Sequence, residues 1–325
     1  MNSRRSVHSC FLAAVVLSLG SACADAPAVR SRPDGLLDVE PSSQGAIVRY
    51  TLDGSDPGRE AGVWLAPVRL PAGYTLKARA FTANGDAIGN VTIREAPPAA
   101  SRTPSTLVPV TQNRDWQAYD WAERHAACVA LMKSRQPEIV MLGDSITHFW
   151  GGEPVGGRRT GAAEWDRFFA GKRVVNLGYG WDRTENVLWR LTHGEFDKVS
   201  PKVVIVMIGA NNMDLNTPDE ITAGIHAICA ELHRRAPAAH ILLLGIFPGG
   251  PKPGATRAKV GAVNERIARL DGRDGVTYVD LGKTFLQADG SISSDVMYDY
   301  FHPTAKGYEM WAAAMSPTLT RLMGH

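Results

Sequence analysis

The sequence predicts an α/β protein in which a doubly wound, five-stranded parallel sheet follows a small all-β domain. Five short, continuously apolar runs occur between residues 139 and 279, with amphipathic stretches between them. Strands that are covered on both faces have such runs, and intervening helices make their pairing parallel. Before residue 96, β-branched and aromatic residues instead alternate with turn-forming clusters, which is typical of short antiparallel strands.

Residues 1–24 have the pattern of a cleaved export signal. Two arginines precede an apolar run at residues 11–19, and Ala22 and Ala24 form the small-residue pattern of a cleavage site. A membrane span needs about 20 apolar residues, so this run is too short, and no longer run follows it. We therefore expect an exported protein, periplasmic or extracellular, without a transmembrane segment. Lipid attachment at Cys23 is the alternative.

The composition is that of a globular protein with nearly balanced charge. The chain of 325 residues is 44% hydrophobic and has 35 Lys and Arg against 33 Asp and Glu, which excludes a disordered chain. A nucleic-acid binder needs an excess of basic residues, so no nucleic-acid partner is expected. No spacing of Cys or His resembles a zinc site. Cys128 and Cys229 lie in apolar helical stretches and are expected to be buried free thiols, with a disulfide as the alternative.

Residues 34–95 are expected to form a small β-sandwich. Residues 46–52 and 74–81 have the composition of strands, and Asn84-Gly85 is a hairpin signal. The string Tyr-Thr-Leu-Asp-Gly-Ser-Asp-Pro at residues 50–57 resembles the C-terminal β-sandwich domain of chitobiases and β-hexosaminidases. That resemblance implies an accessory role beside a carbohydrate-active domain. A structural spacer is the alternative, because a fold does not fix a function.

A linker and a larger domain follow. The segment 96–114 begins with a stretch rich in Pro, Ala, Ser and Thr and is predicted to be an extended linker. Few contacts should cross such a linker, so we expect the chemistry to survive removal of the β domain. The α/β domain is predicted at residues 115–325 and opens with an amphipathic helix at residues 115–135. Its five strands are predicted at residues 139–142, 174–177, 203–208, 241–244 and 276–279.

Polar residues that could carry chemistry follow these strands, at whose carboxyl ends the sites of doubly wound folds lie. Ser145 follows the first strand in Gly-Asp-Ser, where its hydroxyl would face the crevice, although it could merely cap a helix. Asn211 follows the third strand, where its amide could donate to an oxyanion or simply form a turn. Asp299 and His302 lie three residues apart, so the carboxylate can fix the tautomer of the imidazole.

Taken in order, these motifs resemble those of the SGNH (GDSL-like) hydrolases. The motifs are Gly143-Asp144-Ser145, the loop with Gly178 and Gly180, Gly209-Ala210-Asn211-Asn212, and Asp299-x-x-His302. The strings at residues 186–191 and 244–248 are similar to those of bacterial relatives of platelet-activating factor acetylhydrolase catalytic subunits. The resemblance covers about Trp116 to Gly324. It implies a three-layer, flavodoxin-like fold and a serine esterase that needs no metal or organic cofactor.

The resemblance also implies roles for the site residues. Ser145 would be the nucleophile, His302 its base, and Asp299 the residue that orients the imidazole. The oxyanion would lie among the Ser145 N–H, the Asn211 side chain and a backbone N–H of the loop after the second strand.

One position of that loop departs from the family. The glycine that supplies the oxyanion N–H in the acetylhydrolase subunits corresponds to Trp181 here. A backbone N–H survives a change from Gly to Trp, so Gly180 and Trp181 are rival donors. The indole of Trp181 would line the mouth of the pocket and narrow it. Asp144 is expected to stabilise its loop as an acceptor rather than to act as an acid.

The function expected from these features is ester hydrolysis outside the cytoplasm. The resemblance suggests a short acyl group, above all acetyl, and the β domain suggests an O-acetylated carbohydrate as the substrate. A lipid esterase of the lysophospholipase or platelet-activating factor acetylhydrolase kind is the alternative enzyme. A carbohydrate-binding protein with a catalytically dead α/β domain is the alternative from another class, although the presence of all four polar site residues argues against it.

Overall fold

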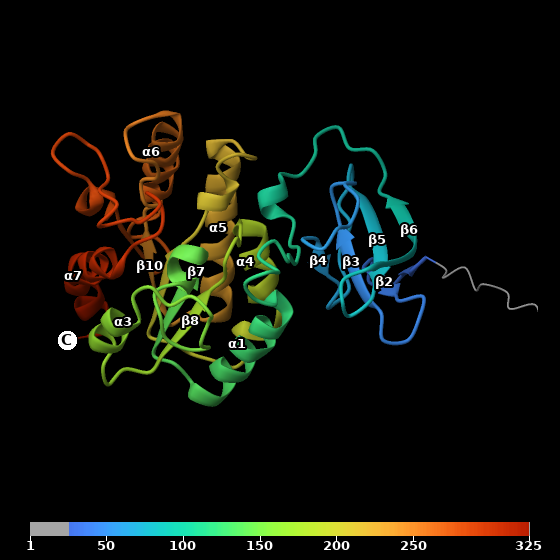
Figure 1. The fold of residues 1–325 in the computed structure, drawn as a ribbon, viewed down its shortest axis with the longest axis horizontal. Coiled ribbons are helices and arrows are strands. Elements are labelled where there is room, and N and C mark those ends of the chain that lie inside the picture. The colour runs from blue at the N-terminus through green and yellow to red at the C-terminus, as the bar shows by residue number, and fades with distance from the viewer. Residues whose placement is uncertain (1–25, 325) are drawn as a thin grey trace, which may run out of the picture.

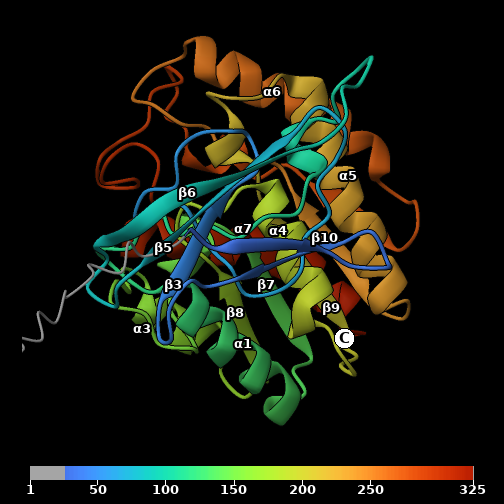
Figure 2. The ribbon, with the colours of Figure 1, turned by 90° about the vertical axis from the view of Figure 1, so that its right-hand side faces the viewer.

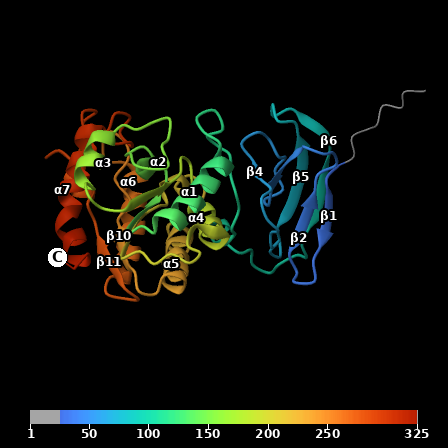
Figure 3. The ribbon, with the colours of Figure 1, turned by 90° about the horizontal axis from the view of Figure 1, so that it is seen from below.

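The computed structural model describes residues 26–324 of the chain. The export signal predicted at residues 1–24 and the alternative of lipid attachment at Cys23 lie outside these residues. Within them, an α/β domain and an all-β domain lie side by side along the longest axis of the molecule (Figure 1), and a connecting segment joins them (Figure 3). In Figure 2 the β domain lies in front of the α/β domain and covers one end of it.

The β domain consists of two antiparallel sheets. Strands β1 (Ala28–Ser31) and β2 (Leu37–Glu40) form the smaller sheet, so the domain begins before the predicted residue 34. The larger sheet has the order β4-β3-β5-β6. Its strands are β3 (Ile47–Thr51), β4 (Gly62–Val63), β5 (Thr75–Phe81) and β6 (Ala87–Glu95). Buried and half-buried residues alternate along β5, because one of its faces packs on the core.

The hairpin signal between the last two β-domain strands is confirmed. Strands β5 and β6 pair directly, and Gly85 in their connection has a φ of 82°. A residue without a Cβ adopts this left-handed conformation readily, which is why Asn-Gly marks such turns.

Five parallel strands form the central sheet of the α/β domain, in the order β11-β10-β9-β7-β8. They are β7 (Ile139–Gly143), β8 (Val174–Gly178), β9 (Val203–Met207), β10 (His240–Leu244) and β11 (Val276–Val279). The strand order reverses between β7 and β9, and ligands bind at such a switch point in doubly wound folds. The predicted parallel, flavodoxin-like sheet is therefore confirmed, with each strand within one residue of its predicted bounds.

Helices cover both faces of this sheet and give three layers (Figure 1). Helices α1, α4, α5 and α6 pack on one face, and α3 and α7 pack on the other. The helices are α1 (Trp121–Arg135), α2 (Ser145–His148), α3 (Ala162–Phe168), α4 (Thr184–Arg190), α5 (Pro218–Arg235), α6 (Ala255–Ile267) and α7 (Ala305–Leu322). Shorter helical turns are η1 (Ser105–Leu107), η2 (Leu191–Glu195), η3 (Ala210–Asn212), η4 (Ala268–Leu270) and η5 (Gly282–Phe285).

Helix α1 begins six residues later than predicted. The side chain of Asp120 accepts a hydrogen bond from the Glu123 N–H and caps the helix there. A cap of this kind satisfies one of the free N–H groups of the first turn. The preceding residues 114–118 fold into turns instead.

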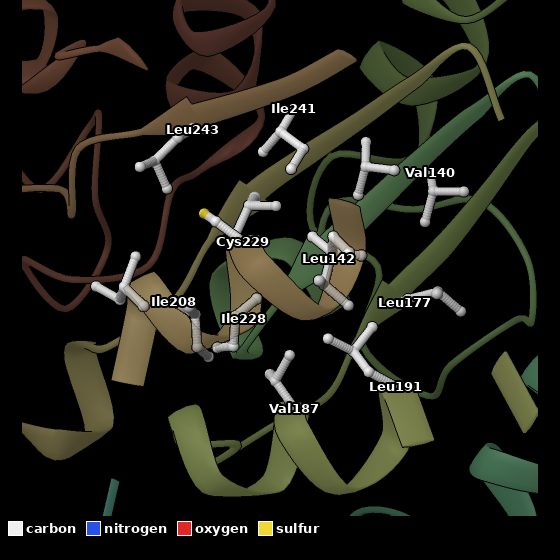
Figure 4. Close-up of a cluster of buried hydrophobic side chains, with 14 of the residues drawn as sticks. Val140, Leu142, Leu177, Val187, Leu191, Ile208, Ile228, Cys229, Ile241 and Leu243 are labelled. Carbon is white, nitrogen blue, oxygen red and sulfur yellow. The ribbon is translucent and has the colours of Figure 1, made fainter. Parts of the chain in front are cut away.

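The main core lies between the sheet and the face that α1, α4, α5 and α6 cover. Figure 4 shows Leu142 and Leu177 of the strands opposite Val187 of α4 and Ile228 of α5. Cys229 belongs to the same core, and both it and Cys128 are buried and free, which confirms the prediction of free thiols. Burial raises the pKa of the Cys229 thiol to about 12, so this thiol is unreactive.

The connecting segment differs from the predicted linker in its second half. Residues 111–113 are buried, and η1 packs against α4 and α5. The hydroxyl of Thr106 donates to the carbonyl of Glu220 (2.7 Å). A composition rich in Pro predicts an extended chain but does not reveal contacts that form only after the domains fold.

Within residues 26–324, no helix has both the length and the apolar character that a membrane span requires. The same residues include no group of three or more His, Cys, Asp or Glu side chains placed to hold a metal ion.

Candidate active site

Ser145 lies at the point where β7 turns sharply into the short helix α2. Gly143 makes this turn feasible, because a Cβ there would lie 2.3 Å from the Thr147 hydroxyl. The Asp144 side chain caps α2 by accepting the N–H of Ile146 (3.0 Å). The turn therefore places the Ser145 hydroxyl at the carboxyl edge of the sheet.

Asp144 itself is buried under this turn. Only 1% of its surface is exposed, and its second carboxylate oxygen has no hydrogen-bond partner among the described residues. Burial raises the pKa of Asp144 to about 7, against the opposing effect of the Ile146 N–H bond. The side chain faces its own loop, as expected of a loop-stabilising acceptor.

His302 links Ser145 to Asp299. The Ser145 Oγ lies 2.8 Å from His302 Nε2, and His302 Nδ1 lies 2.7 Å from Asp299 Oδ2. The other carboxylate oxygen of Asp299 accepts the backbone N–H groups of Phe301 (3.0 Å) and His302 (2.7 Å). Burial alone would raise the pKa of Asp299, but the backbone and the imidazole of His302 outweigh it and lower that pKa. Asp299 is therefore an anion that holds the imidazole by Nδ1.

Two aromatic rings enclose the imidazole of His302. Tyr298 stacks on it with ring centroids 5.7 Å apart, and the Phe149 ring lies 5.3 Å away on a tilted plane. Tyr300 has a φ of 65°, so the tight turn between Asp299 and His302 includes one left-handed residue. This geometry lets two residues three positions apart face each other.

Asn211 reaches the same edge of the sheet from η3, directly after β9. Gly209 opens this turn with a φ of 119°, a conformation that favours glycine. The Asn211 Nδ2 donates to the carbonyl of Asp182 (2.9 Å). An amide nitrogen carries two hydrogens, so the second remains for a ligand in the crevice.

The loop after β8 contains the two rival backbone donors. The Gly180 N–H donates to Nδ1 of His148 (3.2 Å). Burial lowers the pKa of His148 to about 2, so its imidazole is neutral and can accept this bond. Trp181 has a φ of 64°, and its side chain is 49% exposed. The indole therefore lies on the surface rather than in the core.

Two side chains of the connecting segment donate hydrogen bonds to this loop. Gln112 donates to the carbonyl of Gly180 (2.9 Å) and to the carboxylate of Asp182 (3.0 Å). Arg114 donates to the carbonyl of Trp181 (2.8 Å). Burial lowers the pKa of Arg114 to about 10, so it stays charged at neutral pH.

The same stretch also bonds the β domain. Thr111 donates its backbone N–H to the hydroxyl of Tyr50 (3.3 Å), and Asn113 donates its N–H to the carbonyl of Glu60 (3.0 Å). We call residues Thr111–Arg114 the strap, because they bond the β domain on one side and the loop after β8 on the other. Sequence reasoning missed the strap, since its partners in that loop lie 67 to 70 residues further along the chain.

A buried ionic network fixes the end of the loop. Asp182 accepts from the indole N–H of Trp121 (2.8 Å) and from Arg190 (2.8 Å), which also donates to Glu195 (2.6 Å). All three charged side chains are inaccessible to solvent. Removing one partner of such a network leaves a buried charge uncompensated, so the network opposes displacement of Asp182.

A single cavity of about 630 Å³ brings the predicted site residues together. Ser145, Trp181, Asn211, Asp299 and His302 all line it, whereas Gly180 contributes no side chain and directs its N–H to His148. The cavity wall also includes Arg158, which sequence reasoning missed and whose guanidinium lies 4.8 Å from the centre of the Phe149 ring.

The class of this protein follows from its similarity to a known family. The sequence model of the GDSL-like lipase/acylhydrolase family matches residues 141–310, which are 170 of the 325 residues, and the chain belongs to that family. The protein is thus a hydrolase that acts on ester bonds, and the alternative of a catalytically dead carbohydrate-binding protein is not retained. Residues 38–94, in the β domain, match a family described as Fn3 associated.

The chain is also similar to individual named proteins. The platelet-activating factor acetylhydrolase IB subunit alpha1 of Bos taurus is 35% identical over 204 residues, which cover 62% of this chain and 84% of that protein. The alpha2 subunit of Rattus norvegicus is 34% identical over 189 residues, 58% of this chain and 78% of that one. A Bacteroides fragilis structure, described as a candidate acylhydrolase, shares the fold with a TM-score of 0.52 and 16% identity, over 63% of this chain and 99% of that chain.

Proposed function

We propose that this protein is an exported serine esterase that removes short acyl groups, acetyl above all, from O-acetylated carbohydrate. The observation that carries the proposal is the hydrogen-bonded series Ser145–His302–Asp299, with distances of 2.8 and 2.7 Å, on the wall of one cavity. A nucleophile, a base within hydrogen-bond reach and a group that orients the base are the requirements of covalent acyl transfer.

The first half of the reaction forms an acyl-enzyme. The Ser145 oxygen attacks the ester carbonyl carbon while its proton passes to His302 Nε2, and Asp299 stabilises the resulting imidazolium. The tetrahedral intermediate then expels the alcohol, which takes the proton from His302. In the second half, water gives a proton to His302 and attacks the acyl-Ser145 carbonyl. Collapse expels the Ser145 oxygen, which takes that proton from His302, and releases the carboxylic acid.

The negative oxygen of both intermediates requires donors that already point to it. We assign these to the Ser145 N–H, the Asn211 side chain and the Trp181 N–H. Trp181 is preferred to Gly180, because the Gly180 N–H is already bonded to His148. The strap then acts as a positioning element, since Gln112 holds the carbonyl of the Gly180–Trp181 peptide that supplies the donor, and Arg114 holds the carbonyl of the next peptide.

Three arguments support an acetylated carbohydrate as the substrate. The indole of Trp181 occupies the cavity wall, which favours a small acyl group. The N-terminal pattern of an export signal supports a location where polysaccharides occur. The β domain resembles an accessory domain of carbohydrate-active enzymes. The second candidate is an acetyl ester of a lipid, favoured by the names of the relatives and by the exposed side chains of Leu215 and Phe301 at the same cavity.

A substrate comparison separates these candidates. The full chain is assayed with p-nitrophenyl esters from acetyl to palmitoyl, with acetylated xylan and with a phospholipid that carries a short acyl chain. We expect acetyl esters to be preferred among the aryl esters and acetate to be released from xylan. Hydrolysis of the phospholipid without release of acetate from any glycan would support the lipid candidate instead.

Export has its own test. Mass spectrometry of the protein that a bacterial host exports should find an N-terminus at or near Asp25. A diacylglycerol group on Cys23 would support the lipoprotein alternative, and an intact Met1 on all molecules would contradict export by a cleaved signal.

A further inference from the structure

A second cavity lies at the junction of the two domains. Its volume is about 520 Å³, within the range of sites for small ligands. Tyr50 and Asp53 of the β domain, Arg102 of the connecting segment and Glu185 of α4 line it. Side chains from three separate parts of the fold therefore converge on this cavity.

The junction cavity adjoins the active-site cavity, because Arg183 and Leu215 line both. The Arg183 Nε donates to the backbone carbonyl of Asn211 (3.0 Å), which fixes the guanidinium beside the proposed oxyanion hole. Leu215 is 61% exposed. This adjacency would let a substrate chain with one unit at Ser145 extend past Arg183 into the junction cavity.

Charged side chains of both signs line this cavity without pairing to one another. They are the arginines Arg102, Arg114 and Arg183 and the carboxylates Asp53, Glu60, Glu185 and Glu220. None of the seven forms an ion pair with any residue of the described range 26–324. Each keeps part of its hydrogen-bonding capacity for a ligand.

This lining selects for a neutral ligand that is rich in hydroxyl groups. A hydroxyl donates to a carboxylate and accepts from a guanidinium, and bonds with charged partners are the stronger ones. A polyanion or a polycation would meet charges of its own sign. An acyl chain would remove charged groups from water without giving them a partner, which is costly.

We propose that the junction cavity is a second subsite, which binds unreacted sugar units of an oligosaccharide whose acetylated unit lies at Ser145. The inference rests on the proposed esterase function and gives the β domain a direct part in substrate binding. A double variant, Glu60→Ala with Arg102→Ala, tests it. Both residues line the junction cavity and lie outside the catalytic machinery. Both side chains are exposed, so the double variant should fold.

The matched control is Arg94→Ala with Glu95→Ala, which removes the same two charges from exposed positions of β6 outside the cavity. The thermal midpoint of the control should equal that of the wild type. That of the cavity variant should fall by at most a few degrees, because Arg102→Ala removes a guanidinium 3.7 Å from the centre of the Tyr74 ring. On p-nitrophenyl acetate, which cannot reach the junction, kcat/KM should stay within about twofold in both, as expected for exposed positions away from the site.

On acetylated xylotetraose the cavity variant should lose about tenfold in kcat/KM, the size of effect that one or two bonds with charged groups produce. The control variant should not change, and wild-type kcat/KM should rise from acetylated xylose to the tetraose. Equal kcat/KM of the wild type and the cavity variant on the tetraose would overturn the proposal. So would an equal loss on both substrates.

A binding measurement separates failure of the subsite from failure of the proposed esterase function. Unacetylated xylotetraose is titrated calorimetrically into the full-length Ser145→Ala protein, whose junction cavity is intact. We expect binding that weakens about tenfold when Glu60→Ala and Arg102→Ala are added. The absence of binding at millimolar sugar would overturn the subsite even if the wild type hydrolyses aryl acetates. Binding without any esterase activity would instead overturn only the proposed function.

Discussion

Trp181 has a backbone conformation that glycine adopts more readily than any other residue. Its φ is 64°, and its side chain is half exposed beside the cavity. A non-glycine residue in this region costs on the order of 1–3 kcal/mol and is often found at functional sites. We propose that the residue combines a strained peptide, which presents an N–H, with a bulky wall for the acyl group.

Trp181→Gly separates these two properties. The substitution keeps the N–H, relieves the strain and removes the indole, while glycine costs roughly 0.5–1 kcal/mol through the unfolded chain. The thermal midpoint should therefore change by only a few degrees. Hydrolysis of p-nitrophenyl acetate should survive, and the rate on the hexanoate ester relative to the acetate should rise, since each methylene is worth about 1–3 kcal/mol of discrimination. An unchanged ratio in a folded variant would show that the indole does not limit the acyl group.

A second prediction concerns the buried carboxyl group of Asp144. Its pKa rises from the ordinary 3.8 to about 7 in the folded protein, so the folded state binds the proton more tightly than the unfolded chain. This contribution to stability is present below pH 3.8 and is lost as the pH rises to about 7. Asp144→Asn cannot titrate but keeps an oxygen for the Ile146 N–H.

The free energy of unfolding is measured in urea for both proteins between pH 4 and pH 8. The stability of Asp144→Asn relative to the wild type should increase with pH over this window, by up to a few kcal/mol, since one pKa unit corresponds to about 1.4 kcal/mol. A pH-independent difference between the two proteins would show that Asp144 is ionised throughout.

The strands of the α/β domain were predictable from the sequence, and the strap was not. A parallel strand covered on both faces is a continuous apolar run, so β7 to β11 could be located within one residue. Ser145 and Asn211 follow such runs, and Asp299 and His302 precede the last helix. The sequence therefore predicts that these four side chains lie close together. Gln112 and Arg114 lie in a polar, Pro-rich stretch, and only folding brings them into hydrogen-bond contact with the loop after β8.

The strap should affect catalysis through the position of the donor peptide. Arg114→Ala removes the bond to the Trp181 carbonyl and should lower kcat on p-nitrophenyl acetate about ten- to a hundredfold, the usual effect of a small misplacement. The KM for p-nitrophenyl acetate should change little, because this small ester does not reach the junction cavity that Arg114 lines. Arg114→Lys keeps a charged donor and should restore part of the kcat. An equal loss in both variants, or a loss confined to KM, would contradict this role.

The strap changes the expected activity of the α/β domain when the β domain is removed. The η1 turn and the strap bond the α/β domain, whereas Val108 between them packs in the core of the β domain. We propose that the functional unit begins near Arg102 rather than at the predicted residue 115, because it then keeps η1 and the strap. The remaining contacts of the strap with the β domain involve groups that water can replace.

Two truncated chains test this boundary. A chain that starts at Arg102 keeps the strap and should hydrolyse p-nitrophenyl acetate with a kcat within a fewfold of the full chain. A chain that starts at Asp115 loses Gln112 and Arg114, leaves the buried Asp182 with one partner fewer, and should be unstable or inactive. Circular dichroism reports folding in both cases. Full activity of the shorter chain would show that the strap is dispensable.

The proposed Ser145–His302–Asp299 mechanism is tested by the kcat of three variants on p-nitrophenyl acetate: Ser145→Ala, His302→Ala and the double variant. The thermal midpoint verifies that each protein is folded. A nucleophile and its base act as one unit, so each single variant should lose roughly a thousandfold or more, and the double variant should be hardly worse. A fluorophosphonate probe should label Ser145 in the wild type alone. Wild-type turnover by Ser145→Ala, or losses in the two single variants that multiply in the double variant, would contradict a Ser145–His302–Asp299 esterase.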